Sequence, residues 1–132
     1  MSGPVRVEWF TYGDFHGETL VATADEAEAV LRSIDRDPDA GPVLVDFLAP
    51  GGATLTVGAG REFSVLTFQA SSDPPYLVSL GQQGEGPEVH FSYGGSYSEF
   101  LVKHTISKEL AVEALREFVA TGEQPSIVNW EE

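Results

Sequence analysis

The segment Ser107-Lys-Glu-Leu-Ala-Val-Glu-Ala-Leu-Arg-Glu-Phe-Val-Ala-Thr-Gly-Glu-Gln-Pro-Ser-Ile-Val-Asn-Trp130 is the most regular part of the chain. Ser107 is a good N-cap, since its hydroxyl can accept a hydrogen bond from a free N–H group of a helical first turn. Glu109 follows in that turn, where the helix dipole favours a carboxylate. Gly122 can end the helix, and Pro125 cannot continue it. The segment therefore predicts an amphipathic helix whose apolar stripe is Leu110, Ala111, Ala114, Leu115, Phe118 and Val119.

The residues after this helix predict a short strand. Ile127 and Val128 lead to Trp130, so Ser126–Trp130 is expected to form a last edge strand. A large aromatic residue that follows an apolar strand is usually buried. We therefore expect Trp130 to pack against the C-terminal helix.

The middle of the chain predicts a β-sheet. Short apolar or alternating runs recur every 8–12 residues with turn residues between them, which is typical of an antiparallel meander. The expected strands are Val43–Ala49, Ala53–Gly58, Glu62–Gln69, Tyr76–Leu80 and Glu88–Tyr93. The stretch Gly94-Gly95-Ser96-Tyr97-Ser98 is expected to be a loop.

The N-terminal part adds two strands and a helix. Val5–Tyr12 and Thr19–Ala22 are expected to be strands, and Thr23-Ala-Asp-Glu26 has the pattern of a capping box. The helix behind it has a stripe of Ala27, Val30, Leu31 and Ile34, and the acidic loop 35–42 ends it. The whole pattern predicts one α+β domain over residues 1–132, a mostly antiparallel sheet meander with two helices packed on one face.

The composition narrows the chemistry. The chain has no cysteine, which excludes disulfides, thiol chemistry and cysteine-ligated zinc. Its three histidines, His16, His90 and His104, are scattered without metal-ligand spacing, so we expect no metal and no cofactor. The N-terminus does not resemble a signal peptide, and no apolar run is long enough to span a membrane. We expect a cytoplasmic protein.

The net charge points to the kind of partner. The chain has 21 acidic and 7 basic residues, a net charge of −14, whereas a small soluble domain needs only about 2 to 8 charges. Such a surplus repels nucleic acid and anionic membranes and attracts basic surfaces. Half of it lies in residues 14–46, in and around the first helix.

Two groups of residues are candidates for binding a basic partner. The first is an acidic loop in which no helix dipole or pairing is expected to explain the charges: Asp35, Asp37 and Asp39. The second brackets an expected exposed aromatic run of Phe91, Tyr93, Tyr97 and Phe100 with the carboxylates Glu85, Glu88 and Glu99. Tyrosines supply rigid contact area with a polar end, so Tyr93 and Tyr97 are expected to be binding residues with these carboxylates.

No set of catalytic residues is apparent. Gly94–Ser98 superficially resembles a nucleophile elbow but lacks the closing glycine, and the next helix begins too late. These residues leave two kinds of function open. One is a small acidic hydrolase with a carboxylate-containing cleft, and the other is a generic binding module for a basic partner.

The C-terminal segment resembles immunity protein family 1 of bacterial polymorphic toxin systems. The likeness covers roughly residues 40–132 and is carried by the C-terminal helix, the Thr-Gly and Pro that follow it, and the terminal Val-x-Trp. It extends to three upstream stretches, Leu55-Thr-Val-Gly58, Phe63–Phe68 and Pro75-Tyr76-Leu77. The C-terminal residues that match this signature, Phe118, Gly122, Pro125 and Trp130, are assigned to the fold.

The resemblance implies a non-enzymatic α+β protein that forms a 1:1 complex with a toxin domain made in the same cell and covers its active site. Such toxins are often nucleic-acid deaminases, which need a His/Cys/Cys zinc set. A chain without cysteine fits the inhibitor and not that enzyme.

Overall fold

The computed structural model describes residues 3–10, 16–81, 88–93 and 96–132. The described residues form two α-helices, α1 (Ala24–Arg36) and α2 (Lys108–Thr121), and a short 3-10 helix, η1 (Val102–His104). They also form nine strands: β1 (Val5–Phe10), β2 (His16–Val21), β3 (Val43–Leu48), β4 (Thr54–Ala59), β5 (Leu66–Gln69), β6 (Tyr76–Leu80), β7 (Val89–Tyr93), β8 (Ser96–Phe100) and β9 (Asn129–Glu131). Among the described residues, no helix is long and apolar enough to cross a lipid bilayer.

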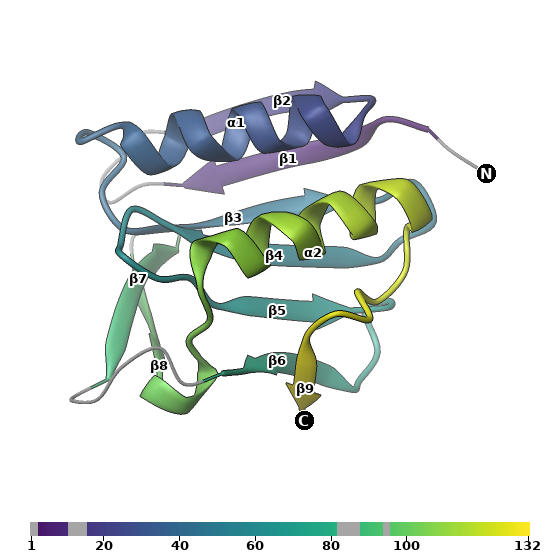
Figure 1. Cartoon of the computed structure of the whole chain (residues 1–132). Helices are drawn as coiled ribbons and strands as arrows, with labels where there is room; N and C mark the ends of the chain where they lie inside the picture. Colours follow the sequence, from purple (N-terminus) through teal and green to yellow (C-terminus); the bar gives the residue numbers. More distant parts are fainter. Residues whose placement is uncertain (1–2, 11–15, 82–87, 94–95) are drawn as a thin grey trace.

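The main sheet has the order β2-β1-β3-β4-β5-β6-β9, and every neighbouring pair in it is antiparallel. Both helices lie side by side on one face of this sheet (Figure 1). A hairpin of β7 and β8 joins β3 through one parallel pairing, Val43 with Ser92. The predicted α+β fold, a mostly antiparallel sheet with two helices on one face, is confirmed.

The helix ends follow from local capping. The Thr23 hydroxyl accepts a hydrogen bond from the Glu26 N–H, and the Glu26 carboxylate accepts one from the Thr23 N–H, which completes the predicted capping box. Ser107 caps α2 through the Leu110 N–H. Gly122 ends α2 in the left-handed conformation, with φ of 72°, which a residue without a Cβ adopts at little cost.

The main core lies between the helices and the sheet. Alternation along each strand sends every second side chain toward the helices, among them Val43, Val45 and Phe47 of β3. Leu115 and Phe118 of α2 meet them, and both are fully buried. Burial of this apolar surface is what fixes α1 and α2 on one side of the sheet.

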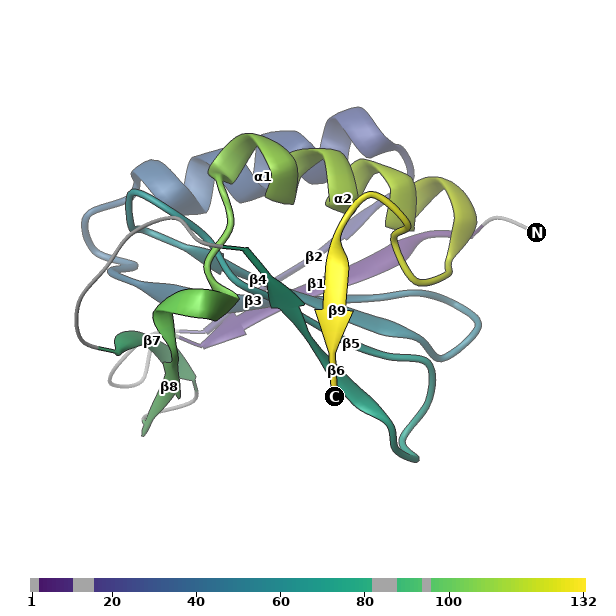
Figure 2. The ribbon, with the colours of Figure 1, turned by 60° about the horizontal axis from the view of Figure 1, so that its bottom comes forward.

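A second, smaller core lies on the opposite face, under the β7–β8 hairpin. Leu44 points away from the helices and packs with Val65 and Phe91, and Val89 and Phe100 pack against this group. Figure 2 shows the helices above the sheet and the hairpin below one end of it.

The hairpin is also held to the neighbouring β4–β5 connection. The Arg61 Nε–H donates to the His90 carbonyl at 2.8 Å, and the Arg61 guanidinium lies over the Phe91 ring. The Phe91 ring fits over Gly58 of β4 so closely that a Cβ there would lie 2.7 Å from it.

Two predictions about this region are wrong. Ser96–Phe100 is a strand, whereas the sequence predicted a loop over Gly94–Ser98; pairing of Tyr93 with Ser96 leaves two glycines between the strands, which is a hairpin signal. Phe91 and Phe100 were both expected to be exposed. Phe91 is fully buried and Phe100 is partly buried, because both pack in the second core.

Several strand boundaries also differ from the prediction. β5 begins at Leu66 and not at Glu62, because Ser64 instead pairs with Ile106 in an isolated bridge. β2 begins at His16, ahead of the predicted Thr19. β9 is the predicted C-terminal edge strand, shortened to three residues.

Candidate partner-binding surface

Asp35 is partly buried and is fixed by two hydrogen bonds to distant parts of the chain. Its carboxylate accepts a hydrogen bond from Lys108 Nζ at 2.9 Å and another from the Gly60 N–H at 2.7 Å. These bonds join the last turn of α1 to the first turn of α2 and to the connection after β4. The expectation that no pairing explains this charge is therefore wrong for Asp35, because its partner lies 73 residues away in the chain.

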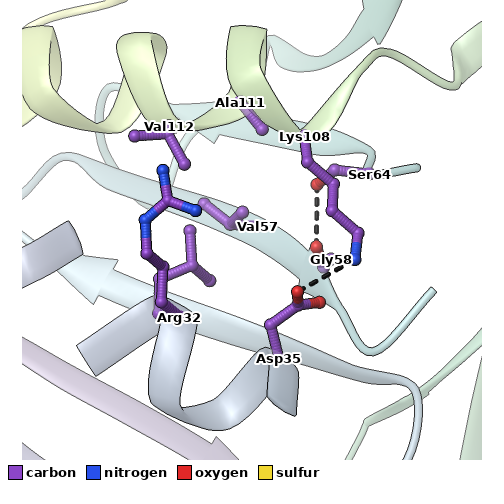
Figure 3. Close-up of a pocket in the computed structure, with 9 residues that line it drawn as sticks. Arg32, Asp35, Val57, Gly58, Ser64, Lys108, Ala111 and Val112 are labelled. Atoms are coloured by element: carbon purple, nitrogen blue, oxygen red, sulfur yellow. Dashed lines mark hydrogen bonds and ion pairs between the residues drawn. The ribbon is translucent and has the colours of Figure 1, made fainter. Parts of the chain in front are cut away.

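A small pocket opens beside this ion pair, between α1, α2 and β4 (Figure 3). Its volume is about 30 Å³, and most of its lining is apolar: Leu31, Val57, Ala111 and Val112. A space of this size admits a water molecule or two. Its one carboxylate, Asp35, is already paired with Lys108, so this pocket has neither the room nor the free acid that a hydrolase cleft needs.

Asp37 and Asp39 lie on the surface after α1. Asp37 is the C-cap residue of α1, and its carboxylate accepts a hydrogen bond from the Asp39 N–H at 2.9 Å. The loop then leads to Pro42, whose carbonyl accepts a hydrogen bond from the Ser92 N–H of β7. The structure thus brings the acidic loop and the hairpin to the same end of the molecule (Figure 1).

The hairpin contributes carboxylates to this end. His90 and Glu99 are cross-strand neighbours with 3.2 Å between His90 Nε2 and Glu99 Oε1. Glu88 lies beside them, and one ligand atom from each of the three residues falls within 4.8 Å of the others. Both glutamates are exposed. Of the remaining predicted residues, Glu85 and the side chain of Tyr97 lie outside the described part of the chain.

The face of the sheet opposite the helices carries polar residues in register. We call this surface the open face. Residues directly opposite each other on antiparallel strands point to the same side, and a row of them crosses four strands: Glu18 of β2, Glu8 of β1, Asp46 of β3 and Thr56 of β4. Arg6, two residues before Glu8 on β1, pairs with both glutamates. The row therefore holds three carboxylates, of which the Arg6 guanidinium pairs with two, Glu8 and Glu18.

Asp46 is the most buried carboxylate of this row, with 9% of its surface exposed. Its Oδ1 accepts a hydrogen bond from the Thr56 hydroxyl at 2.6 Å, and its Oδ2 accepts one from the Tyr93 hydroxyl at 2.9 Å. Burial raises the pKa of Asp46, the two hydrogen bonds lower it, and the nearby Glu8 carboxylate raises it further. Burial and the Asp46 charge also raise the pKa of Tyr93 to about 12.

The bond between Tyr93 and Asp46 links the hairpin to the open face. Tyr93 is 42% exposed, so its ring is available at the surface while its hydroxyl reaches Asp46. The register also places Leu20 and Tyr76, both more than half exposed, on the open face. Leu20 and Tyr76 lie on strands far apart in the sheet order, so Tyr93 is the exposed aromatic residue that lies directly beside Asp46.

The residues assigned to the fold lie together near the end of α2. Phe118 is fully buried and contacts Phe68 edge to face, and Pro125 is buried. Trp130 is partly buried: its ring contacts Phe68, and its indole N–H donates to the Pro125 carbonyl. Trp130 is thus packed, partly buried, against the core to which α2 contributes Leu115 and Phe118.

Sequence analysis missed Asp46, although a signal was present. The strand reads Val43-Leu-Val-Asp-Phe-Leu48, in which one acid interrupts an apolar run. Aspartate is disfavoured inside strands, so its presence there indicates a specific role. The charge count included Asp46 but did not separate it from the many solvated carboxylates.

Comparison with known proteins agrees with the expectation from the sequence. Residues 16–132 match the family described as immunity protein Imm1. A protein of Burkholderia cenocepacia (strain H111), described as a double-stranded DNA deaminase immunity protein, is 26% identical over 123 residues. That alignment covers 90% of this chain and 96% of the relative.

Proposed function

This chain belongs to the Imm1 family of immunity proteins, and we propose that it protects its cell by binding a deaminase toxin domain and blocking the toxin's active site. The observation that carries the proposal is the family match over residues 16–132, together with the alignment to a deaminase immunity protein along nearly its whole length. In this proposal the chain is an inhibitor without catalytic activity of its own. It acts in the cytoplasm and forms a 1:1 complex with its toxin.

The charge of the chain supports the proposed mode of action. A toxin that acts on DNA or RNA must present a basic surface to phosphates. A protein with a net charge of −14 is attracted to such a surface, and it can occupy the place of the nucleic acid. Attraction between opposite charges also speeds association, to about 10⁸ M⁻¹s⁻¹ or more at low salt. Rapid capture is useful when a few free toxin molecules can damage the genome.

We propose that the toxin contacts the end of the molecule where the acidic loop and the hairpin meet. The contributing residues are those predicted from the sequence: Asp37, Asp39, Glu85, Glu88, Tyr93, Tyr97 and Glu99 contact the toxin, and Asp35 holds the loop in place through its pair with Lys108. Of these, Asp37, Asp39, Glu88 and Glu99 are exposed and can meet basic side chains directly. Tyr93 offers a partly exposed ring, which is the kind of group that supplies affinity in an interface.

The first test is co-purification of this chain with the toxin domain encoded beside its gene. The toxin's deaminase activity should fall in proportion to the amount of chain added and reach zero at one equivalent. The complex should weaken as the salt concentration rises. Failure of the two proteins to bind at low salt would contradict the proposal.

A second test separates attraction from anchoring. Asp37→Lys with Asp39→Lys should slow association and leave dissociation nearly unchanged, whereas Tyr93→Ala should mainly speed dissociation. Asp35 is left intact in this experiment because its reversal would break the ion pair with Lys108. Equal and negligible effects from both changes would place the toxin on another face.

A further inference from the structure

Asp46 is a carboxylate removed from water without a cation to balance it. All seven Lys and Arg residues lie in the described part of the chain. None of these, and no described His side chain, is within ion-pair distance of Asp46. Its partners are the hydroxyls of Thr56 and Tyr93. Buried charges in proteins are normally paired with an opposite charge, so this arrangement is incomplete.

The neighbours of Asp46 make the arrangement more costly. Glu8, with 17% of its side chain exposed, lies directly opposite Asp46 on β1, and like charges at such positions repel each other. Arg6, two residues before Glu8 on β1, is already engaged by Glu8 and Glu18. A neutral residue of the same shape at position 46 would remove this repulsion and could still accept the hydrogen bonds of the two hydroxyls.

We propose that Asp46 is the anchor for one cationic side chain, an arginine or a lysine, of the toxin that this chain binds. The inference rests on the proposed function and names the chemistry at the centre of its interface. The cation enters from the open face and lies against both Asp46 and Glu8. It supplies the opposite charge that the free protein lacks.

The geometry of the carboxylate suits this role. An ionised carboxylate can accept about four hydrogen bonds, and each Asp46 oxygen accepts one. Thr56 and Tyr93 fix the direction of the group, so an incoming guanidinium meets an oriented acceptor. The partly exposed Tyr93 ring stands beside it, and an aromatic ring also attracts a cation.

The strands around Asp46 make its position suitable for an anchor. Thr56, Glu8 and Tyr93 come from three strands that surround Asp46, so the site is held by the sheet and the hairpin together. Charged anchors contribute most to binding when they are buried and oriented, and least at an exposed rim. The exposed Asp37 and Asp39 fit the rim, and Asp46 fits the centre.

The test compares Asp46→Asn with Asp73→Asn. The asparagine side chain keeps the shape and much of the hydrogen-bonding capacity of the aspartate and removes its charge. Asp73 lies exposed in the connection between β5 and β6, so its change removes an identical charge from the surface. Affinity for the toxin domain is measured by surface plasmon resonance, and thermal unfolding is measured on the free proteins.

We expect Asp46→Asn to reduce the affinity by at least about 30-fold, mainly through faster dissociation. Asp73→Asn should change it less than about twofold. The melting temperature of free Asp46→Asn should be equal to or higher than that of the original protein, because a repelled, desolvated charge has been removed. A structural role for Asp46 predicts the opposite, a lower melting temperature.

The outcomes distinguish the inference from the function on which it rests. If the unaltered chain does not bind the toxin, the proposed function fails. If the unaltered chain binds the toxin and Asp46→Asn binds it equally well, the proposal that Asp46 is an anchor is wrong and the proposed function stands. If Asp46→Asn weakens the complex and also lowers the melting temperature, Asp46 has a structural role and the anchor proposal is wrong. Tyr93→Phe, which keeps the ring and removes the hydroxyl bonded to Asp46, should then weaken binding no more than Asp73→Asn does.

Discussion

Carboxylates on the two faces of the sheet have different bonding partners. On the helix side Asp35 is partly buried and pairs with Lys108, with a further hydrogen bond from the Gly60 backbone. On the open face Asp46 is buried and its side chain receives only hydroxyl hydrogen bonds, while Glu8 lies opposite it. The first arrangement is complete in the free chain. The second becomes complete only when a cation arrives.

This difference indicates that different carboxylates of an acidic protein can serve folding and partner binding. The helix side buries the apolar core and pairs the charges that border it, so changes there act on folding. The open face leaves carboxylates and apolar groups uncovered, so changes there act on binding. Four experiments test this division.

Phe118→Ala should have the largest effect, a loss of about 3–5 kcal/mol in the free energy of unfolding, because the ring is fully buried between α2 and Phe68. Leu20→Ala on the open face is the control and should change that energy by less than about 0.5 kcal/mol. Urea denaturation followed by circular dichroism measures both. Similar losses of unfolding energy for the two variants would contradict the division of folding and binding between the two faces of the sheet.

Trp130→Ala should cost less, about 2–3 kcal/mol, since the indole is only partly buried although it packs on Phe68 and bonds to Pro125. The same denaturation experiment measures it. Trp130→Phe keeps most of the ring contact and should recover more than half of the loss. An unchanged unfolding energy for Trp130→Ala would mean that the C-terminal strand is not part of the cooperative fold.

Asp35→Asn should reduce the free energy of unfolding by about 1 kcal/mol, because it weakens the partly exposed pair with Lys108. Asp37→Asn on the neighbouring exposed position is its control and should be nearly neutral. Toxin affinity should change by a similar small factor in both variants. A large loss of affinity with Asp35→Asn alone would indicate that the toxin binds the helix side of the molecule.

The pH dependence of stability should show the smallest effect. The folded pKa of Asp46 is raised above the ordinary value of 3.8, so the folded chain holds its proton more tightly than the unfolded chain. The contribution of Asp46 to stability is therefore greatest at low pH, and it is lost as the pH rises from about 4 through the raised folded pKa. The groups that face Asp46 from the neighbouring strands are Glu8, Thr56 and Tyr93.

The difference in unfolding energy between the unaltered chain and Asp46→Asn, measured from pH 4 to pH 8, isolates this contribution. Glu28 and Glu131 have lowered pKa values, which favour the folded state at higher pH, but they are present in both proteins and cancel. A difference that grows in favour of the aspartate as the pH rises would show that Asp46 is stabilised as a charge by the fold.

The elements that the sequence predicted well depend on local interactions. Thr23, Ser107 and Gly122 cap their helices within four residues, and the apolar stripes behind the two N-caps identify the buried faces. The fold class and the positions of both helices follow from such patterns. Strand boundaries were predicted less well, because pairing with a distant strand decides where each one begins.

The features that the sequence did not predict depend on distant partners. The strand at Ser96–Phe100 exists because β7 pairs with it, and Asp35 is neutralised by a lysine in another helix. The role of Asp46 depends on Tyr93, 47 residues away. In a chain with 21 acids, no local pattern shows which carboxylate lacks a cation.

The contact between Gly58 and Phe91 has a consequence for how related sequences can diverge. The ring occupies the space that a side chain at position 58 would fill, so a larger residue there would lift the hairpin from the sheet and draw Tyr93 away from Asp46. The two positions are therefore expected to change together. Relatives that acquire a bulky residue at position 58 should carry a small one at position 91, so that the hairpin keeps its position against the sheet.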